Sequence, residues 1–144
     1  MAAIAVPIPA RVSRVFTDQC RIRTFIVGPG GITAGNVVAI TAAGRVVRCN
    51  TATGGKQQAR GIALETLNEG QGVDILEEGF VAGFDLTNLG YDALVYAQDT
   101  DGALGDAGGT KVVPVGRCVP LADRDAAGNP SKVLYVRFSA TTNY

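Results

Sequence analysis

The chain has 144 residues, of which 47% are apolar and 18% are charged, so it is long enough to form one domain with a substantial core. Its 19 glycines and 6 prolines favour short strands joined by turns over long helices. It contains no histidine, which excludes Ser-His-Asp and Cys-His catalysis and any zinc site that uses histidine.

The net charge is zero, but the two halves of the chain are oppositely charged. Residues 1–60 carry eight basic side chains and one acid, which gives +7. Residues 61–144 carry five basic side chains and twelve acids, which gives −7. Two explanations stay open. The opposite charges attract one another within one fold, or they meet between neighbouring molecules in an assembly.

The three cysteines, Cys20, Cys49 and Cys118, are odd in number and far apart. A disulfide framework favours an even number, and a zinc site needs closer spacing. We therefore expect reduced thiols and no metal or other cofactor. The apolar residues 1–10 lack a basic flank and contain two prolines, so they do not predict a signal peptide. No uncharged apolar run reaches the roughly 18 residues of a membrane span.

Residues 1–27 are predicted to form an extended N-terminal arm, separate from a β domain of residues 28–144. Pro7 and Pro9 exclude a regular helix near the N-terminus. The sequence after them alternates charged and apolar residues over much of its length, which is typical of an extended arm or of an edge strand. A Gly-Pro-Gly-Gly run at residues 28–31 marks the boundary between the arm and the domain.

The arm is the predicted interaction surface of the protein. Alternate side chains of an extended chain share a face, so Arg21, Arg23 and Phe25 point to the same side. Arginine binds carboxylates through its forked guanidinium and covers apolar surface with its stem, which suits contacts with another protein. The candidate interface residues are Arg11, Arg14, Phe16, Arg21, Arg23 and Phe25.

The β domain is predicted to be all-β, a small antiparallel β-sandwich or open barrel. No window of about 12 residues has good helical periodicity. Gly44 is expected to supply the positive φ of a three-residue hairpin loop, and residues 99–109 and 122–131 have the composition of turns. The predicted strands are 36–41, 45–49, 60–65, 72–77, 79–84, 92–98, 110–120 and 132–138.

The motifs that would indicate an active site or a metal site are incomplete. Gly55-Lys56 lacks both the earlier glycine and the following Ser or Thr of a P-loop. Residues 99–102, with the sequence D-T-D-G, are similar to part of an EF-hand loop, but Gly108 stands where the closing acid is needed. We therefore expect a tight turn at this place, and we expect the protein not to be an enzyme.

A series of short, mostly glycine-centred motifs runs through the distal part of the chain. They are G-I-A (61–63), E-G-F-V-A-G (78–83), L-V-Y (94–96), D-T-D-G-A-L (99–104), V-G-R-C-V (115–119) and V-L-Y-V-R-F (133–138). This pattern, over roughly residues 30–138, resembles the small capsid decoration, or cement, proteins of tailed bacteriophages. The resemblance implies a compact β domain of the β-tulip kind, usually a homotrimer, on the outside of an icosahedral head. It implies no catalytic residues.

The sequence thus predicts a structural virion protein, made in the bacterial cytoplasm, that stabilises a phage head by bridging subunits of the major capsid protein. A membrane partner is not expected. Nucleic acid is not expected either, because only Phe16 and Phe25 accompany the arginines of the arm and the rest of the domain is acidic. The alternatives are a small ligand- or sugar-binding β domain, although no Trp is present to form a sugar platform, and an accessory domain of an enzyme.

Overall fold

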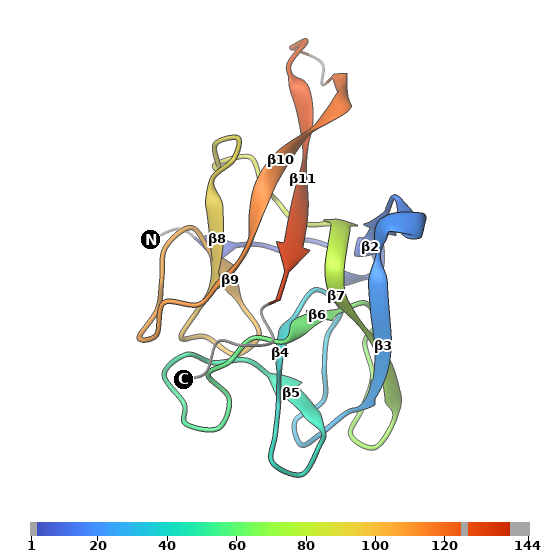
Figure 1. Ribbon diagram of the computed structural model, residues 1–144, viewed down its shortest axis with the longest axis vertical. Helices are drawn as coiled ribbons and strands as arrows, with labels where there is room; N and C mark the ends of the chain where they lie inside the picture. Colours follow the sequence, from blue (N-terminus) through green and yellow to red (C-terminus); the bar gives the residue numbers. More distant parts are fainter. Residues whose placement is uncertain (1–2, 125–126, 139–144) are drawn as a thin grey trace.

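The computed structural model describes residues 3–124 and 127–138, and this part of the chain is all-β (Figure 1). The only helical segments within it are two single 3-10 turns, η1 (Pro9–Arg11) and η2 (Thr17–Gln19), so it has no helix that could cross a membrane. The predicted fold class is confirmed. The strands are β1 (Ala3–Ile4), β2 (Ser13–Val15), β3 (Arg21–Ile26), β4 (Val37–Ile40), β5 (Val46–Arg48), β6 (Gly61–Ala63), β7 (Gly72–Ala82), β8 (Leu94–Ala97), β9 (Leu104–Gly105), β10 (Pro114–Arg124) and β11 (Pro130–Arg137).

One antiparallel sheet contains all these strands. Its main path has the order β1-β9-β8-β10-β11-β7-β6-β4-β5, and β2 and β3 join it at β7. The long strand β7 organises it, because β6 and β11 pair with one edge of β7 while β2 and β3 pair with the other. The sheet curls into a half-barrel. At one end the curl closes, since Val27, directly after β3, forms a parallel bridge with Val46 of β5.

The curled sheet has apolar clusters on both of its faces where β6 meets β7. Ile62 pairs with Leu76, and both belong to the larger cluster. The next pair, Ala63 and Ile75, belongs to a smaller cluster on the other side, which also contains Val27. Neighbouring residues of a strand point to opposite faces, so this part of the sheet is buried on both sides. Burial on both sides also explains why two successive residues are apolar in each strand, Ile62-Ala63 in β6 and Ile75-Leu76 in β7.

The two strands predicted at residues 72–77 and 79–84 form the single strand β7. In its ladder with β3, Arg21 pairs with Glu78 and Ile22 pairs with Leu76, which leaves Glu77 without an opposite residue. This is a β-bulge, in which one extra residue bends the strand without ending it.

The other predicted strands are present, but they begin or end at different residues from those predicted. Gly44 in the hairpin loop has the predicted positive φ, 80°. The stretch predicted as a turn at residues 99–109 contains β9. Strands β10 and β11 also continue into the predicted connector, where Arg124 pairs with Pro130. Beyond the pair Cys118 and Leu134 these two strands pair only with each other, so their hairpin projects from the body of the molecule (Figure 1).

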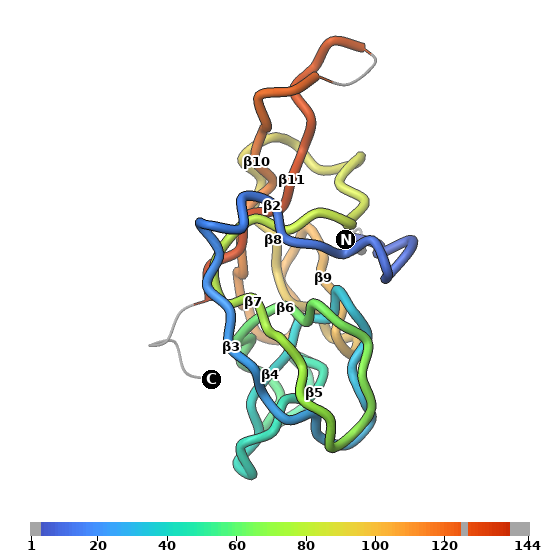
Figure 2. Tube along the Cα trace, turned by 90° about the vertical axis from the view of Figure 1, so that its right-hand side faces the viewer, coloured from blue at the N-terminus to red at the C-terminus, as the bar shows by residue number. Residues whose placement is uncertain are grey.

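The N-terminal segment is extended over much of its length, and it packs against the β domain of the same chain. β1 pairs with β9, and β2 and β3 run beside β7 (Figure 2). Ile4 and Val12 are buried in the larger cluster. Gly83 makes room for the segment, because a Cβ there would lie 2.8 Å from the Cα of Val12. Residues 3–26 are therefore held against the β domain, and the division of the chain at residue 27 stays a prediction.

Candidate interaction face

Three aromatic side chains form a row on the outer face of the sheet. Phe80 of β7 lies opposite Tyr135 of β11, and their ring centroids are 5.0 Å apart. Phe16, directly after β2, packs edge-on against Phe80 at 5.3 Å and is 47% exposed. The row is on the outside because the neighbours of Tyr135 along β11, Leu134 and Val136, are buried in the larger cluster.

The position of Phe16 depends on an unusual backbone conformation. Its φ of 55° lies in the left-handed region, which bulky residues other than glycine rarely adopt. The chain turns here from β2 into η2, and the amide of Gln19 donates to the carbonyl of Phe16 at 2.8 Å. The turn thereby directs the Phe16 ring onto Phe80, and such strained residues are found preferentially at functional places.

Charged side chains form a ladder on the same face of the sheet. Glu77 Oε1 lies 3.1 Å from Arg23 Nε and 3.7 Å from Arg21 Nε. Glu78 Oε1 lies 4.0 Å from Arg21 Nη1 and 3.9 Å from Arg137 Nε. Glu78 and Arg137 are two residues along from Phe80 and Tyr135, so the ladder adjoins the aromatic row. At this place the basic and acidic halves of the chain attract one another within one molecule, which is the first of the two explanations for the charge division.

The six predicted interface residues do not all lie together. Phe16, Arg21 and Arg23 belong to the face formed by the row and the ladder, which we call the interaction face. Phe25 is half-buried against the smaller cluster, with the Arg23 guanidinium 4.9 Å above its ring. Arg11 and Arg14 are exposed at the edge of the molecule, and no ion pair within the described residues involves them.

Five residues of the interaction face were not among the predicted ones. They lie far along the sequence from the arm, and only the strand register brings them to it. The alternation of residues in the strands at 79–84 and 132–138 is the one sequence signal that could have placed any of them on a solvent-facing side. They are Glu77, Glu78, Phe80, Tyr135 and Arg137.

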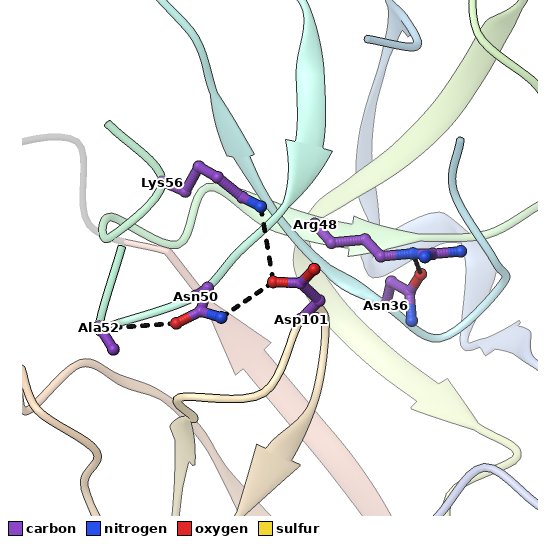
Figure 3. Close-up of polar contacts among 6 residues, drawn as sticks. All are labelled: Asn36, Arg48, Asn50, Ala52, Lys56 and Asp101. Atoms are coloured by element: carbon purple, nitrogen blue, oxygen red, sulfur yellow. Dashed lines mark hydrogen bonds and ion pairs between the residues drawn. The ribbon is translucent and has the colours of Figure 1, made fainter. Parts of the chain in front are cut away.

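A second polar cluster joins the loops at one end of the sheet (Figure 3). Asp101 accepts a hydrogen bond from Asn50 Nδ2 at 2.9 Å and lies 3.5 Å from Lys56 Nζ. The amide of Ala52 donates to Asn50 Oδ1 at 2.9 Å. The hydrogen bond from Asn50, and then the charge of Lys56, hold the pKa of Asp101 below its usual value. These polar groups bind one another, so the cluster fastens two loops together.

The neighbouring carboxylate of Asp99 fastens a third segment in the same way. It accepts hydrogen bonds from the Thr51 hydroxyl, the Thr110 amide at 2.8 Å and the Thr110 hydroxyl at 2.7 Å. These bonds, the one from Thr51 first, lower the pKa of Asp99. The turn expected at residues 99–102 is present. Within residues 3–124 and 127–138 no group of three or more acidic or thiol side chains could hold a metal ion.

The thiols are unpaired in this structure, and two of them are buried. Burial raises the pKa of Cys49 to about 12, although the nearby charge of Lys56 opposes the shift. Burial also raises the pKa of Cys118.

No protein-family model matches the chain, and no curated protein or solved structure matches it. The similarity to phage decoration proteins therefore stays a prediction from short sequence motifs.

Proposed function

We propose that this protein is a structural component of a tailed-phage head, which binds the outside of the shell and bridges neighbouring capsid subunits. The observation that carries the proposal is the row of Phe16, Phe80 and Tyr135, which is exposed at Phe16, half-buried at the other two rings and held on three hydrogen-bonded segments. Aromatic residues and arginine are enriched at protein interfaces and supply a large share of their binding energy. The row and the arginines around it therefore have the composition of a protein-binding surface.

The ionic ladder prepares this surface for binding. Glu77 holds both Arg21 and Arg23, so their side chains lose less conformational freedom when a partner arrives. A solvated ion pair contributes at most about 1 kcal/mol, so one copy binds a shell weakly through charge alone. We propose that the protein acts as a homotrimer, because three linked copies of the face multiply such contacts through avidity.

The proposed function contains no catalytic step, cofactor or nucleic acid. The carboxylates of Asp99 and Asp101, in the stretch that is similar to part of an EF-hand loop, are engaged by hydrogen bonds and one ion pair. Their partners are Thr51, Thr110, Asn50 and Lys56. This engagement supports a scaffolding role for the loops.

The proposal is tested on heads of the phage whose genome encodes the chain, prepared without this protein. Wild-type protein is added back and bound protein is separated by sedimentation. We expect saturable binding, and Phe16→Ser should weaken it by about tenfold or more, because an anchor of an interface is lost. Arg124→Glu on the projecting hairpin is the control and should bind as the wild type does.

Substitutions are preferable to truncation here, because β2 and β3 cover an edge of β7 and their removal would disturb the fold. Circular dichroism of each variant checks that it is folded. A wild-type protein that does not bind these heads, and that is missing from purified virions, would refute the proposed function.

A further inference from the structure

A groove lies between the N-terminal segment, the loop after β7 and the base of the projecting hairpin. It consists of two hollows of about 300 and 420 Å³, which adjoin because Phe84 and Asp85 line both of them. The first hollow ends at the N-terminal segment, and the second ends at residues 130–132 of β11. In Figure 2 the dark blue start of the chain and the yellow-green loop after β7 lie on the right, whereas β3 lies on the left. No residue that lines the groove belongs to the interaction face.

The apolar part of the groove is accessible to another molecule. Ile8, at the N-terminal end of the groove, is 44% exposed, and Phe84, in its middle, is half-buried. Large apolar side chains that are exposed together in a hollow lose contact with water only when a partner covers them, and such surfaces mark interaction sites. The groove therefore provides an apolar seat for a protruding part of a partner.

Three charged residues line the groove, and two of them are engaged within the chain. Asp85 accepts hydrogen bonds from the amide and the hydroxyl of Thr87, at 3.1 and 2.6 Å. The ammonium of Lys132 has three N–H donors, and three carbonyl oxygens lie within 3.5 Å of its Nζ atom, that of Leu89 at 2.6 Å. The third charged residue, Arg11, is exposed and has no ion pair within the described part of the chain. Its guanidinium is therefore available to an acid of a partner.

The projecting hairpin of the same chain is an unsupported protrusion. Beyond the pair Cys118 and Leu134 its two strands pair only with each other, and a two-stranded ribbon alone is marginally stable in water. Pro120 on β10 and Pro130 on β11 lack an N–H, so the ribbon is a poor edge for a further strand. A partner would therefore support it through side-chain contacts and not by extending the sheet.

The side of the ribbon that faces away from its own groove carries apolar and acidic side chains. Pro120 pairs with Lys132, and the Lys132 ammonium reaches the loop beside the groove, so this pair faces the groove of its own chain. Leu121 is the next residue in β10, so it points to the other side of the ribbon, where it is partly exposed. Asp123, further out, is exposed, and none of the ion pairs among the described residues involves it.

We propose that the projecting hairpin of one copy of this chain lies in the groove of a second copy. Leu121 packs against Ile8 and Phe84. The carboxylate of Asp123 pairs with the guanidinium of Arg11. The contact joins two different surfaces, so it is head-to-tail, and three such contacts close a ring. This inference rests on the proposed homotrimer, for which it names the contact, and it leaves the interaction face of each copy uncovered.

Charge reversal tests the ion pair in the full-length protein without phage heads. Sedimentation velocity at about 50 µM should show the wild type as a trimer. Arg11→Glu places an acid opposite Asp123, and Asp123→Arg places a cation opposite Arg11, so each variant should dissociate at least about tenfold more readily. The double variant has opposite charges again and should recover the trimer.

Two matched variants serve as controls. Arg14→Glu changes another exposed arginine of the N-terminal segment that does not line the groove. Arg124→Glu changes the residue after Asp123, which points to the opposite side of the ribbon. Both should remain trimeric, and circular dichroism should show that all the variants are folded.

A cross-link tests the geometry of the contact. Ile8→Cys combined with Leu121→Cys places one new thiol on each side of it, and mild oxidation should give covalent trimers on non-reducing electrophoresis. Because the contact joins different surfaces, each single variant should cross-link no more than the wild type does.

The inference is overturned by a wild type that is monomeric under these conditions, or by a double charge reversal that does not recover the trimer. Cross-links in either single variant would overturn it as well, because like surfaces would then meet. An Arg11→Glu protein that stays trimeric but no longer sediments with heads would mean that the groove holds a segment of the capsid protein instead. None of these results decides whether the protein binds the shell, because the add-back assay with Phe16→Ser measures that separately.

Discussion

Arg23 and Glu77 meet at the bulge of β7, where the guanidinium Nε lies 3.1 Å from the carboxylate Oε1. The bulge leaves Glu77 without an opposite residue in β3, and its side chain reaches both Arg23 and Arg21. The carboxylate is 15% exposed, whereas each arginine is 61% exposed. One shielded acid thus holds two solvent-facing cations in place, and the edge strand to which they belong is fastened to the centre of the sheet.

This arrangement predicts that Glu77→Gln destabilises the protein more than Glu78→Gln does. Both arginines lose their shared charged partner, and we expect the free energy of unfolding to fall by about 1 kcal/mol, a value limited by solvent screening of the arginines. Glu78 is 36% exposed and its contacts are 3.9 and 4.0 Å, so its loss should matter less.

Urea unfolding at low salt and at about 1 M salt measures both variants. The difference in unfolding free energy between the two variants should shrink at high salt, where the Debye length is about 3 Å. Equal losses at both salt concentrations would show that charge is not what Glu77 contributes.

The close packing of the N-terminal segment against Gly83 predicts that Gly83→Ala strongly destabilises the protein. Gly83 has a φ of 105°, which disfavours any side chain, and the new Cβ would meet the backbone of Val12. We expect a loss of about 2 kcal/mol or more and faster proteolysis within the first twelve residues. The matched control is Gly54→Ala, where no atom lies within 4 Å of the added Cβ. Similar unfolding midpoints for both variants would mean that the segment does not pack closely against residue 83.

The thiols should differ in reactivity toward an alkylating reagent at about pH 8. Cys20 is half-buried, whereas Cys49 and Cys118 are fully buried and have raised pKa values, so little of either is present as the reactive thiolate. Mass spectrometry should find Cys20 modified first in the native protein, and the other two only after denaturant is added. Early modification of Cys49 would contradict its burial.

The hydrogen bonds to Asp99 predict a stability that depends on pH. The folded-state pKa of Asp99 is below its ordinary value of 3.8, so the unfolded chain takes up the proton more readily than the folded one. The stabilisation is therefore complete above about pH 4 and is lost as the pH falls through the folded-state pKa. Asp99→Asn should be less stable than the wild type at neutral pH, and the gap should narrow in acid.

Urea midpoints between about pH 7 and pH 2.5 measure this effect. Thr51→Val removes the largest cause of the lowered pKa, so it should flatten the same acid-dependent part of the curve. A difference in urea midpoint between Asp99→Asn and wild type that stays constant in acid would rule out this role for the carboxylate.

Local patterns were sufficient to predict the all-β class, most strand positions and the hairpin at Gly44, because alternation and turn residues act over a few positions. They also placed Arg21 and Arg23 on one side of an extended chain. Local patterns do not contain the register between distant strands. The bulge at Glu77 and the meeting of Phe16, Phe80 and Tyr135 depend on that register, so they became visible only in the structure.

The same limit applies to the N-terminal segment. Its alternating sequence indicates an extended chain equally well for a free arm and for a strand paired at the edge of a sheet. The pairing with β7 depends on Gly79 and Gly83, where the added Cβ atoms would lie within 3 Å of Cys20 and Val12. Glycines that make room for a distant segment look like turn glycines in a sequence.

The pairing of Ile62 with Leu76 and of Ala63 with Ile75 has a consequence for how the molecule comes apart. These residues form a wall shared by two apolar clusters, so neither cluster loses its packing without exposing the back of the other. The two ends of the half-barrel should therefore not melt separately, and a single cooperative transition is expected. In native-state hydrogen exchange the amides of Ile75 and Leu76 should be among the last to exchange, at the rate set by global unfolding.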